Sequence, residues 1–277
     1  MENYSKKKYV LIVAFLLIIL AVIPETRALL TVKVYKEMNK NESILKTENI
    51  DFEIPSGAST ASKDWMPIMI WYHDKGGFSR LMGKELDMTV LYSFGAFDSL
   101  FGSSSYYNEK SPYYGAFYGG YAIKDMANPE DAFGFNEDGS IIPHEVESVP
   151  KYDQKYLVLP ALGCPKDKRV FETQIISIQD HVDYAGYNGW TRVDSSIYTN
   201  GPAHESSEFN IGYLQYGKPL KPVKSKVNFQ PQWFKGRMYI RYFDDIKMTI
   251  CLYVICKDEK QINLCDDELL SHVKIKP

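Results

Sequence analysis

Short runs of alternating apolar and polar residues recur from Trp65 onward, and this alternation constrains the fold more than any other feature of the sequence. In residues 86–94, LDMTVLYSF, every second side chain is apolar, and residues 248–256 repeat the pattern. Because successive side chains of a β-strand point to opposite faces, such alternation predicts strands that bury one face. Clusters of Gly, Pro, Asn and Asp separate the runs, as in HDKGG and TNGPA, and such clusters are typical of turns.

The composition supports the same fold class. The chain has 21 Tyr and 14 Phe among 277 residues, and aromatic residues are enriched in strands. After the N-terminal segment no stretch shows a long helical period. Residues 65–277 are therefore predicted to form a mostly β domain, an antiparallel β-sandwich or open barrel with few short helices, preceded by an N-terminal hydrophobic helix.

The N-terminus has the layout of an export or anchoring segment. Three lysines, at positions 6–8, precede the uncharged run YVLIVAFLLIILAVI at 9–23, and Pro24 follows it. A basic stretch, an apolar core and a helix-breaking exit are typical of a signal sequence. We therefore predict a signal peptide or signal-anchor transmembrane segment at 1–30, which leaves two alternatives open. The run is shorter than the roughly 20 residues of a full span.

Each alternative implies a location. As an anchor, residues 9–23 would hold the chain in the cell membrane by a single pass, with the C-terminal domain outside the cytoplasm. Cleavage near Ala28 would instead secrete the domain. Residues 31–64 contain the Ser-, Gly- and Ala-rich stretch PSGASTASKD and are predicted to form a polar stalk or linker.

Charge argues against nucleic acid as a partner. The net charge is −3, and the first 28 residues carry four basic and two acidic side chains. The rest of the chain therefore carries −5. Nucleic-acid binding depends on clustered Lys and Arg, so no nucleic acid is expected to bind.

An aromatic stretch offers one candidate ligand site. Residues 105–121 read SYYNEKSPYYGAFYGGY. Exposed rings with polar tips could bind sugars or peptides, whereas buried rings would only fill a core, which is their commoner use. The candidate ligand-binding residues are Tyr106, Tyr107, Tyr113, Tyr114 and Tyr118.

Residues 134–145, GFNEDGSIIPHE, partly match a calcium-binding loop. Asn136, Asp138 and Glu145 stand where oxygen ligands are expected. Against this, Gly134 replaces the usual first Asp, and Pro143 stands where the exiting helix should begin. The alternative is an Asp-Gly turn between two strands.

Two further groups could support hydrolytic chemistry. Most of the five histidines have acidic neighbours, but no HExxH or comparable spacing is present, so unrelated histidines are the plainer interpretation. Cys164 has lysines nearby that could lower its pKa, although no catalytic signature surrounds it. The histidines are His73, His144, His181, His204 and His272.

The C-terminal cysteines suggest a possible disulfide. Residues 257–260, KDEK, are predicted to form a hairpin turn that places QINLC beside the preceding strand. In one register Cys251 would face Cys265 and could bridge to it in an oxidising compartment. Cys256 would instead be buried and unpaired. The alternative is that all four cysteines are free and buried.

The sequence favours a non-enzymatic, membrane-anchored or exported protein whose β-rich domain binds a partner, a ligand or an envelope component. No cofactor is expected. One alternative is an exported hydrolase that uses a His and acid cluster or Cys164. Another is a structural subunit of the envelope. Convergence of the histidines, Cys164 and nearby acids in one pocket would favour the hydrolase.

Overall fold

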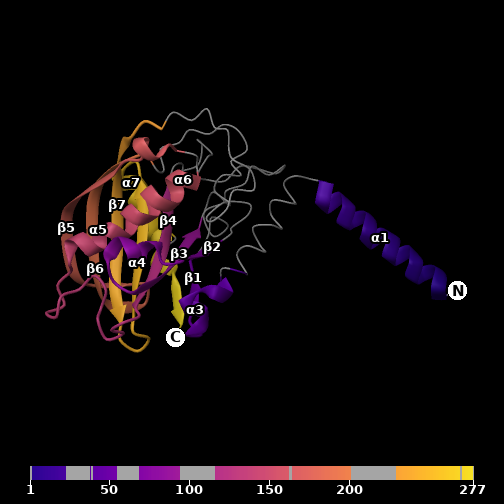
Figure 1. Ribbon diagram of the computed structural model, residues 1–277, viewed down its shortest axis with the longest axis horizontal. Helices are drawn as coiled ribbons and strands as arrows, with labels where there is room; N and C mark the ends of the chain where they lie inside the picture. Colours follow the sequence, from indigo (N-terminus) through magenta and orange to yellow (C-terminus); the bar gives the residue numbers. More distant parts are fainter. Residues whose placement is uncertain are drawn as a thin grey trace.

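A computed structural model of the chain describes residues 2–22, 38, 40–54, 69–93, 116–161, 164–200, 229–268 and 270–276. It confirms a β-rich domain with an antiparallel sheet of seven strands, in the order β2-β3-β4-β8-β7-β6-β5, and few short helices (Figure 1). The strands are β2 Met69–His73, β3 Leu86–Ser93, β4 Phe117–Asp125, β5 Phe171–Tyr184, β6 Tyr187–Thr199, β7 Gln232–Phe243 and β8 Met248–Cys256.

The strand β8 lies at the centre of the sheet and shows how the alternating pattern is used. It pairs with β4 on one side and β7 on the other, and all its residues are buried. Ile250, Leu252 and Val254 belong to one core cluster, whereas Cys251 and Tyr253 belong to the other. The alternation therefore predicted the strand correctly, but both of its faces are covered.

One face of the sheet, which we call the α5 face, is covered by helices. These are α4 (Gly77–Met82), α5 (Pro143–Tyr152) and the π-helix η2 (Asp153–Val158). Phe78 from α4 and Val149 from α5 are fully buried in the cluster that holds Tyr253. The chain then continues into α6 (Leu159–Ala161) and the 3-10 turn η3 (Lys166–Lys168).

The opposite face, the α7 face, is covered by segments from both ends of the chain. They include α3 (Ile44–Thr47), α7 (Glu259–Glu268) and the turn η5 (Leu270–His272). The strands β1 (Asp51–Glu53) and β9 (Lys274–Lys276) pair antiparallel as a separate two-stranded ribbon. Each of these segments contributes buried residues to the core cluster that holds Leu252. The ribbon contributes Phe52 and Ile275.

The sandwich and barrel predictions need correction. Within the described residues the large sheet is open, ending at β2 and β5, and its covering layers are helices and a small ribbon rather than a second large sheet. The covering helices are too short to produce a long helical period. In α5, for example, the buried apolar residues are Val146, Val149, Pro150 and Tyr152, which cover only about two helical turns.

The predicted stalk at 31–64 also needs correction where it is described. Leu45 is fully buried, and Phe52 is only 1% exposed. Both pack in the core of the α7 face, and Phe52 pairs with Ile275 across the ribbon. The globular domain therefore includes residues 40–54 and begins well before Trp65.

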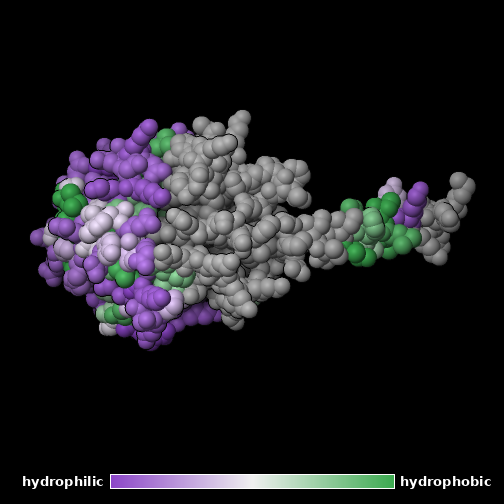
Figure 2. Space-filling model, turned by 90° about the horizontal axis from the view of Figure 1, so that it is seen from above, coloured by the Kyte–Doolittle hydropathy of each residue, from purple (hydrophilic) through white to green (hydrophobic). Residues whose placement is uncertain are grey.

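The N-terminal residues form the helix α1 (Glu2–Val22). Its large apolar side chains between Tyr9 and Ile18 are exposed, and Figure 2 shows a green, apolar patch on this helix. None of the helices in the described part of the chain combines the length and the apolar character that crossing a membrane requires.

Candidate ligand-binding site

The pairing of β6 with β7 places charged residues opposite one another on the α7 face. Asp194 pairs with Arg237, and the next pair on this face joins Arg192 to Tyr239. In the other direction Ser196 pairs with Lys235. Because directly opposed residues of neighbouring strands share a face, two arginines, a lysine and a carboxylate lie together.

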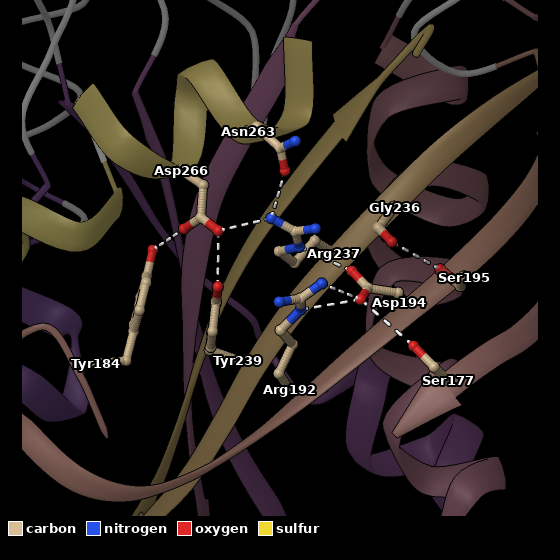
Figure 3. Close-up of polar contacts among 10 residues, drawn as sticks. All are labelled: Ser177, Tyr184, Arg192, Asp194, Ser195, Gly236, Arg237, Tyr239, Asn263 and Asp266. Carbon is tan, nitrogen blue, oxygen red and sulfur yellow. Dashed lines mark hydrogen bonds and ion pairs between the residues drawn. The ribbon is translucent and has the colours of Figure 1, made fainter. Parts of the chain in front are cut away.

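Arg237 is the centre of this group and is almost completely buried, with 6% of its surface exposed. Its Nε donates to Asp194 Oδ1 at 2.7 Å. Its Nη1 donates to Asp266 Oδ2 at 2.9 Å and to Asn263 Oδ1 at 3.0 Å. Asn263 and Asp266 are three residues apart and so share one side of α7, from which both reach toward the guanidinium (Figure 3).

Two tyrosines complete the coordination of Asp266. Tyr239 donates its hydroxyl to Oδ2 at 2.6 Å, and Tyr184 donates to Oδ1. The two rings are stacked, with centroids 3.6 Å apart. Burial and the neighbouring carboxylate raise the pKa of both hydroxyls above the ordinary value, so both remain protonated donors. The carboxylate of Asp266 thus fastens α7 to the sheet.

Asp194 is held ionised by its neighbours. Burial opposes its ionisation, but the hydrogen bonds from Arg192 and Arg237 outweigh this and leave its pKa below the ordinary value. Arg192 donates from Nη2 at 2.6 Å and from Nε at 2.9 Å, both to Oδ2, and Ser177 also donates to Oδ2. One carboxylate therefore receives bonds from two guanidinium groups.

A cavity of about 260 Å³ opens beside this network, between β5–β7 and the beginning of α7. Its apolar lining comes from Ile176 on β5 and Ile262 on α7. Lys235 and Glu259, both exposed to solvent, also line the cavity, and neither has a hydrogen-bond or ion-pair partner among the described residues. The full lining is Ile176, Ser177, Arg192, Asp194, Ser195, Lys235, Gly236, Arg237, Glu259 and Ile262.

Only one residue of the predicted aromatic site, Tyr118, belongs to the described part of the chain, and it does not face a ligand site. Tyr118 lies on β4 with 5% of its surface exposed, packed in the core of the α7 face. Its ring therefore serves the core. The other four predicted residues, Tyr106, Tyr107, Tyr113 and Tyr114, lie outside the described residues.

The predicted calcium loop is a tight turn. Asp138 accepts bonds from the backbone N–H and the hydroxyl of Ser140, at 2.9 and 2.6 Å. The backbone N–H of Asn136 bonds back to the Ser140 carbonyl, and Gly139 has the positive φ of an Asp-Gly turn.

Glu145, the third predicted calcium ligand, is buried and already occupied. Its Oε2 accepts from the Gly134 N–H at 2.9 Å, and its Oε1 is paired with Lys84. Within the described ranges no group of three or more His, Cys, Asp or Glu residues is arranged to hold a metal ion.

The histidines that can be placed are dispersed. His73 on β2 lies 3.6 Å from Asp87. His144, His181 and His272 are exposed on α5, β5 and η5 respectively, and His204 lies outside the described residues.

Cys164 lacks the environment of a nucleophile. It is buried, with 1% of its surface exposed, and burial raises the pKa of its thiol. A nucleophilic cysteine needs the opposite shift.

The predicted pairing of Cys251 with Cys265 is wrong. Residues 259–268 form the helix α7 rather than a returning strand. Cys251 belongs to the core of the α5 face, and Cys265 to the core of the α7 face. The sheet therefore separates them, and all four cysteines are free and buried.

No family model, curated protein or solved structure matches the chain.

Proposed function

We propose that this chain is a non-enzymatic binding protein, held at the cell membrane through residues 9–23 with its domain outside the cytoplasm. Its binding site is the cavity beside Arg237. The ligand is a small zwitterion of the size and charge of a free amino acid. The observation that carries the proposal is a pair of opposite charges on the walls of that cavity, Lys235 and Glu259, which have no partner among the described residues.

The charge balance of the cavity supports a ligand with both signs. Asp194 is neutralised by Arg192 and Arg237, and Arg237 is also neutralised by Asp266. No other described residue pairs with Lys235 or Glu259, so both can interact with a bound ligand. A ligand carboxylate beside Lys235 and an ammonium beside Glu259 would complement both charges.

The volume and the apolar lining of the cavity further restrict the class of ligand that it can hold. A volume of about 260 Å³ lies below the roughly 300–1,000 Å³ of pockets for larger organic ligands. Ile176 and Ile262 offer apolar contact to a short side chain. These features fit a single amino acid better than a sugar chain or a folded partner.

Equilibrium binding to the full-length protein in mild detergent tests the ligand. The probes are the free amino acids, with acetate and methylammonium as single-charge controls. We expect at least one amino acid to bind and both controls to bind more weakly. Failure of every amino acid to bind at millimolar concentration would contradict the proposed ligand class.

Two variants test the site itself. Lys235→Gln and Glu259→Gln should each weaken binding about tenfold, because each removes one charge-assisted hydrogen bond. Lys151→Gln, which removes an exposed charge on α5, is the matched control and should bind like the parent. Unchanged affinity in both cavity variants would move the site elsewhere.

Cell fractionation tests the membrane part separately. The full-length protein should sediment with membranes, and externally added protease should digest the domain in intact cells. Recovery of the full-length chain in the soluble cytosol would refute the anchor but leave the binding site untouched.

A further inference from the structure

Two of the four buried thiols lie on the same side of the sheet. Cys256 is the last residue of β8, and its side chain belongs to the core of the α7 face. Cys265 is one of the inward residues of α7, together with Ile262. Both cysteines have no exposed surface. The strand and the helix that packs on it therefore each present a thiol to the same core.

The turn between them brings the helix back over the strand. Asp258 Oδ1 accepts from the Gln261 N–H at 2.9 Å, and the Gln261 side chain accepts from the Lys257 N–H at 3.2 Å. This reciprocal pattern resembles a capping box, which fixes the beginning of a helix. Burial raises the pKa of Cys256, and the neighbouring Cys265 raises it further.

We infer that Cys256 and Cys265 form an intramolecular disulfide when the domain folds in the presence of a small disulfide oxidant such as oxidised glutathione. One protein thiolate attacks the oxidant and releases one glutathione thiol. The second protein thiolate then displaces the other. Two protein thiols are oxidised to one disulfide, and one oxidant disulfide is reduced to two thiols.

The other two cysteines are excluded by position. Cys251 faces the opposite side of the sheet. Cys164 lies near Asn200, whose Nδ2 is 4.0 Å from its sulfur. Since the folded protein buries both reacting thiols, the bridge closes before or while α7 packs on β8. An extracytoplasmic location would supply oxidising conditions at that stage.

Oxidative refolding of the full-length protein in detergent tests the inference. The protein is denatured and reduced, refolded in a glutathione redox buffer, and then unfolded in urea that contains the alkylating reagent but no reductant, so that every free thiol is labelled. It is digested with trypsin without reduction. Trypsin cuts after Lys247, Lys257, Lys260 and Lys274. The bridge therefore joins peptide 248–257 to peptide 261–274 in the mass spectrum.

Fragmentation then identifies the bridged residue, because peptide 248–257 contains both Cys251 and Cys256. We expect the alkyl label on Cys251 and on Cys164, and none on Cys256 or Cys265. Cys251→Ser should keep the cross-linked peptide, whereas Cys256→Ser and Cys265→Ser should lose it. The bridged protein should also unfold about 5 °C or more above the reduced protein.

Several results would overturn the inference. Alkyl labels on both Cys256 and Cys265 after refolding would do so, as would a bridge that survives in Cys256→Ser. The peptide analysis of the parent protein decides between these outcomes even if a cysteine variant fails to fold.

Discussion

The guanidinium of Arg237 and the carboxylate of Asp266 form an ion pair, with Nη1 2.9 Å from Oδ2, that joins the seven-stranded sheet to helix α7. Both side chains are nearly buried. Asp266 also accepts a hydrogen bond from the hydroxyl of Tyr239, and Arg237 forms a second ion pair with Asp194. This contact is one of those that hold α7, and with it one wall of the candidate site, against the sheet.

Asp266→Ala should therefore destabilise the domain strongly. It leaves Arg237 with one carboxylate partner and leaves the hydroxyls of Tyr184 and Tyr239 without acceptors. Breaking a buried ion pair costs about 3 kcal/mol or more, which urea unfolding of the full-length protein would measure. As a control, Glu53→Ala disrupts the exposed pair with Lys274 and should change little. Equal effects of the two variants would refute the structural role of Asp266.

Acid should weaken the domain partly through Asp194. Its pKa is lowered in the folded protein from the ordinary value of 3.8. A group with a depressed folded pKa contributes stability that is complete above the unfolded pKa and is lost as the pH falls through the folded one.

The urea midpoint should therefore fall as the pH decreases below about 4, and Asp194→Asn should flatten that decrease. Midpoints measured between pH 2 and pH 6 provide the comparison. If the variant and the parent show the same acid dependence, the ion pairs of Asp194 do not contribute in this way.

Gly119→Ala should disturb the centre of the sheet. A Cβ at this position of β4 would lie 2.1 Å from the backbone oxygen of Leu91 and 3.1 Å from the ring of Tyr253. The neighbouring strand would have to move, and overpacking of this kind costs about 1–3 kcal/mol. At Gly120 the closest atom would be 3.1 Å away. Urea unfolding should thus show a larger loss for Gly119→Ala than for Gly120→Ala, and the reverse order would contradict the packing described.

Phe52→Ala tests whether the segment before Trp65 belongs to the domain. Phe52 is buried in the α7-face core and lies opposite Ile275. Its truncation should cost about 3–5 kcal/mol of unfolding free energy. Thr47→Ala, at an exposed position of α3, should have a small effect. A loss no greater than that of Thr47→Ala would mean that this segment is a solvated stalk after all.

Local patterns predicted the strands but not what covers them. The alternation in residues 248–256 predicted β8, and the Asp-Gly sequence at 138–139 allowed the turn that the structure contains. The sequence predicted a hairpin turn at 257–260 and a returning strand at 261–265, whereas residues 259–268 form α7, in which the buried Ile262, Cys265 and Asp266 have helical spacing. Asp258 and Gln261 also stood at the spacing of a capping box, a signal that could have identified the helix.

The sequence by itself determined the β class of the domain, because side-chain alternation along a strand is a local property. It could not place Asp194 opposite Arg237, since the register of β6 against β7 depends on packing between segments far apart in the chain. Nor could it decide which cysteines share a core. Tertiary structure assigned Cys251 to one face of the sheet and Cys256 with Cys265 to the other, because only the packed layers fix which side of a strand each covering helix occupies.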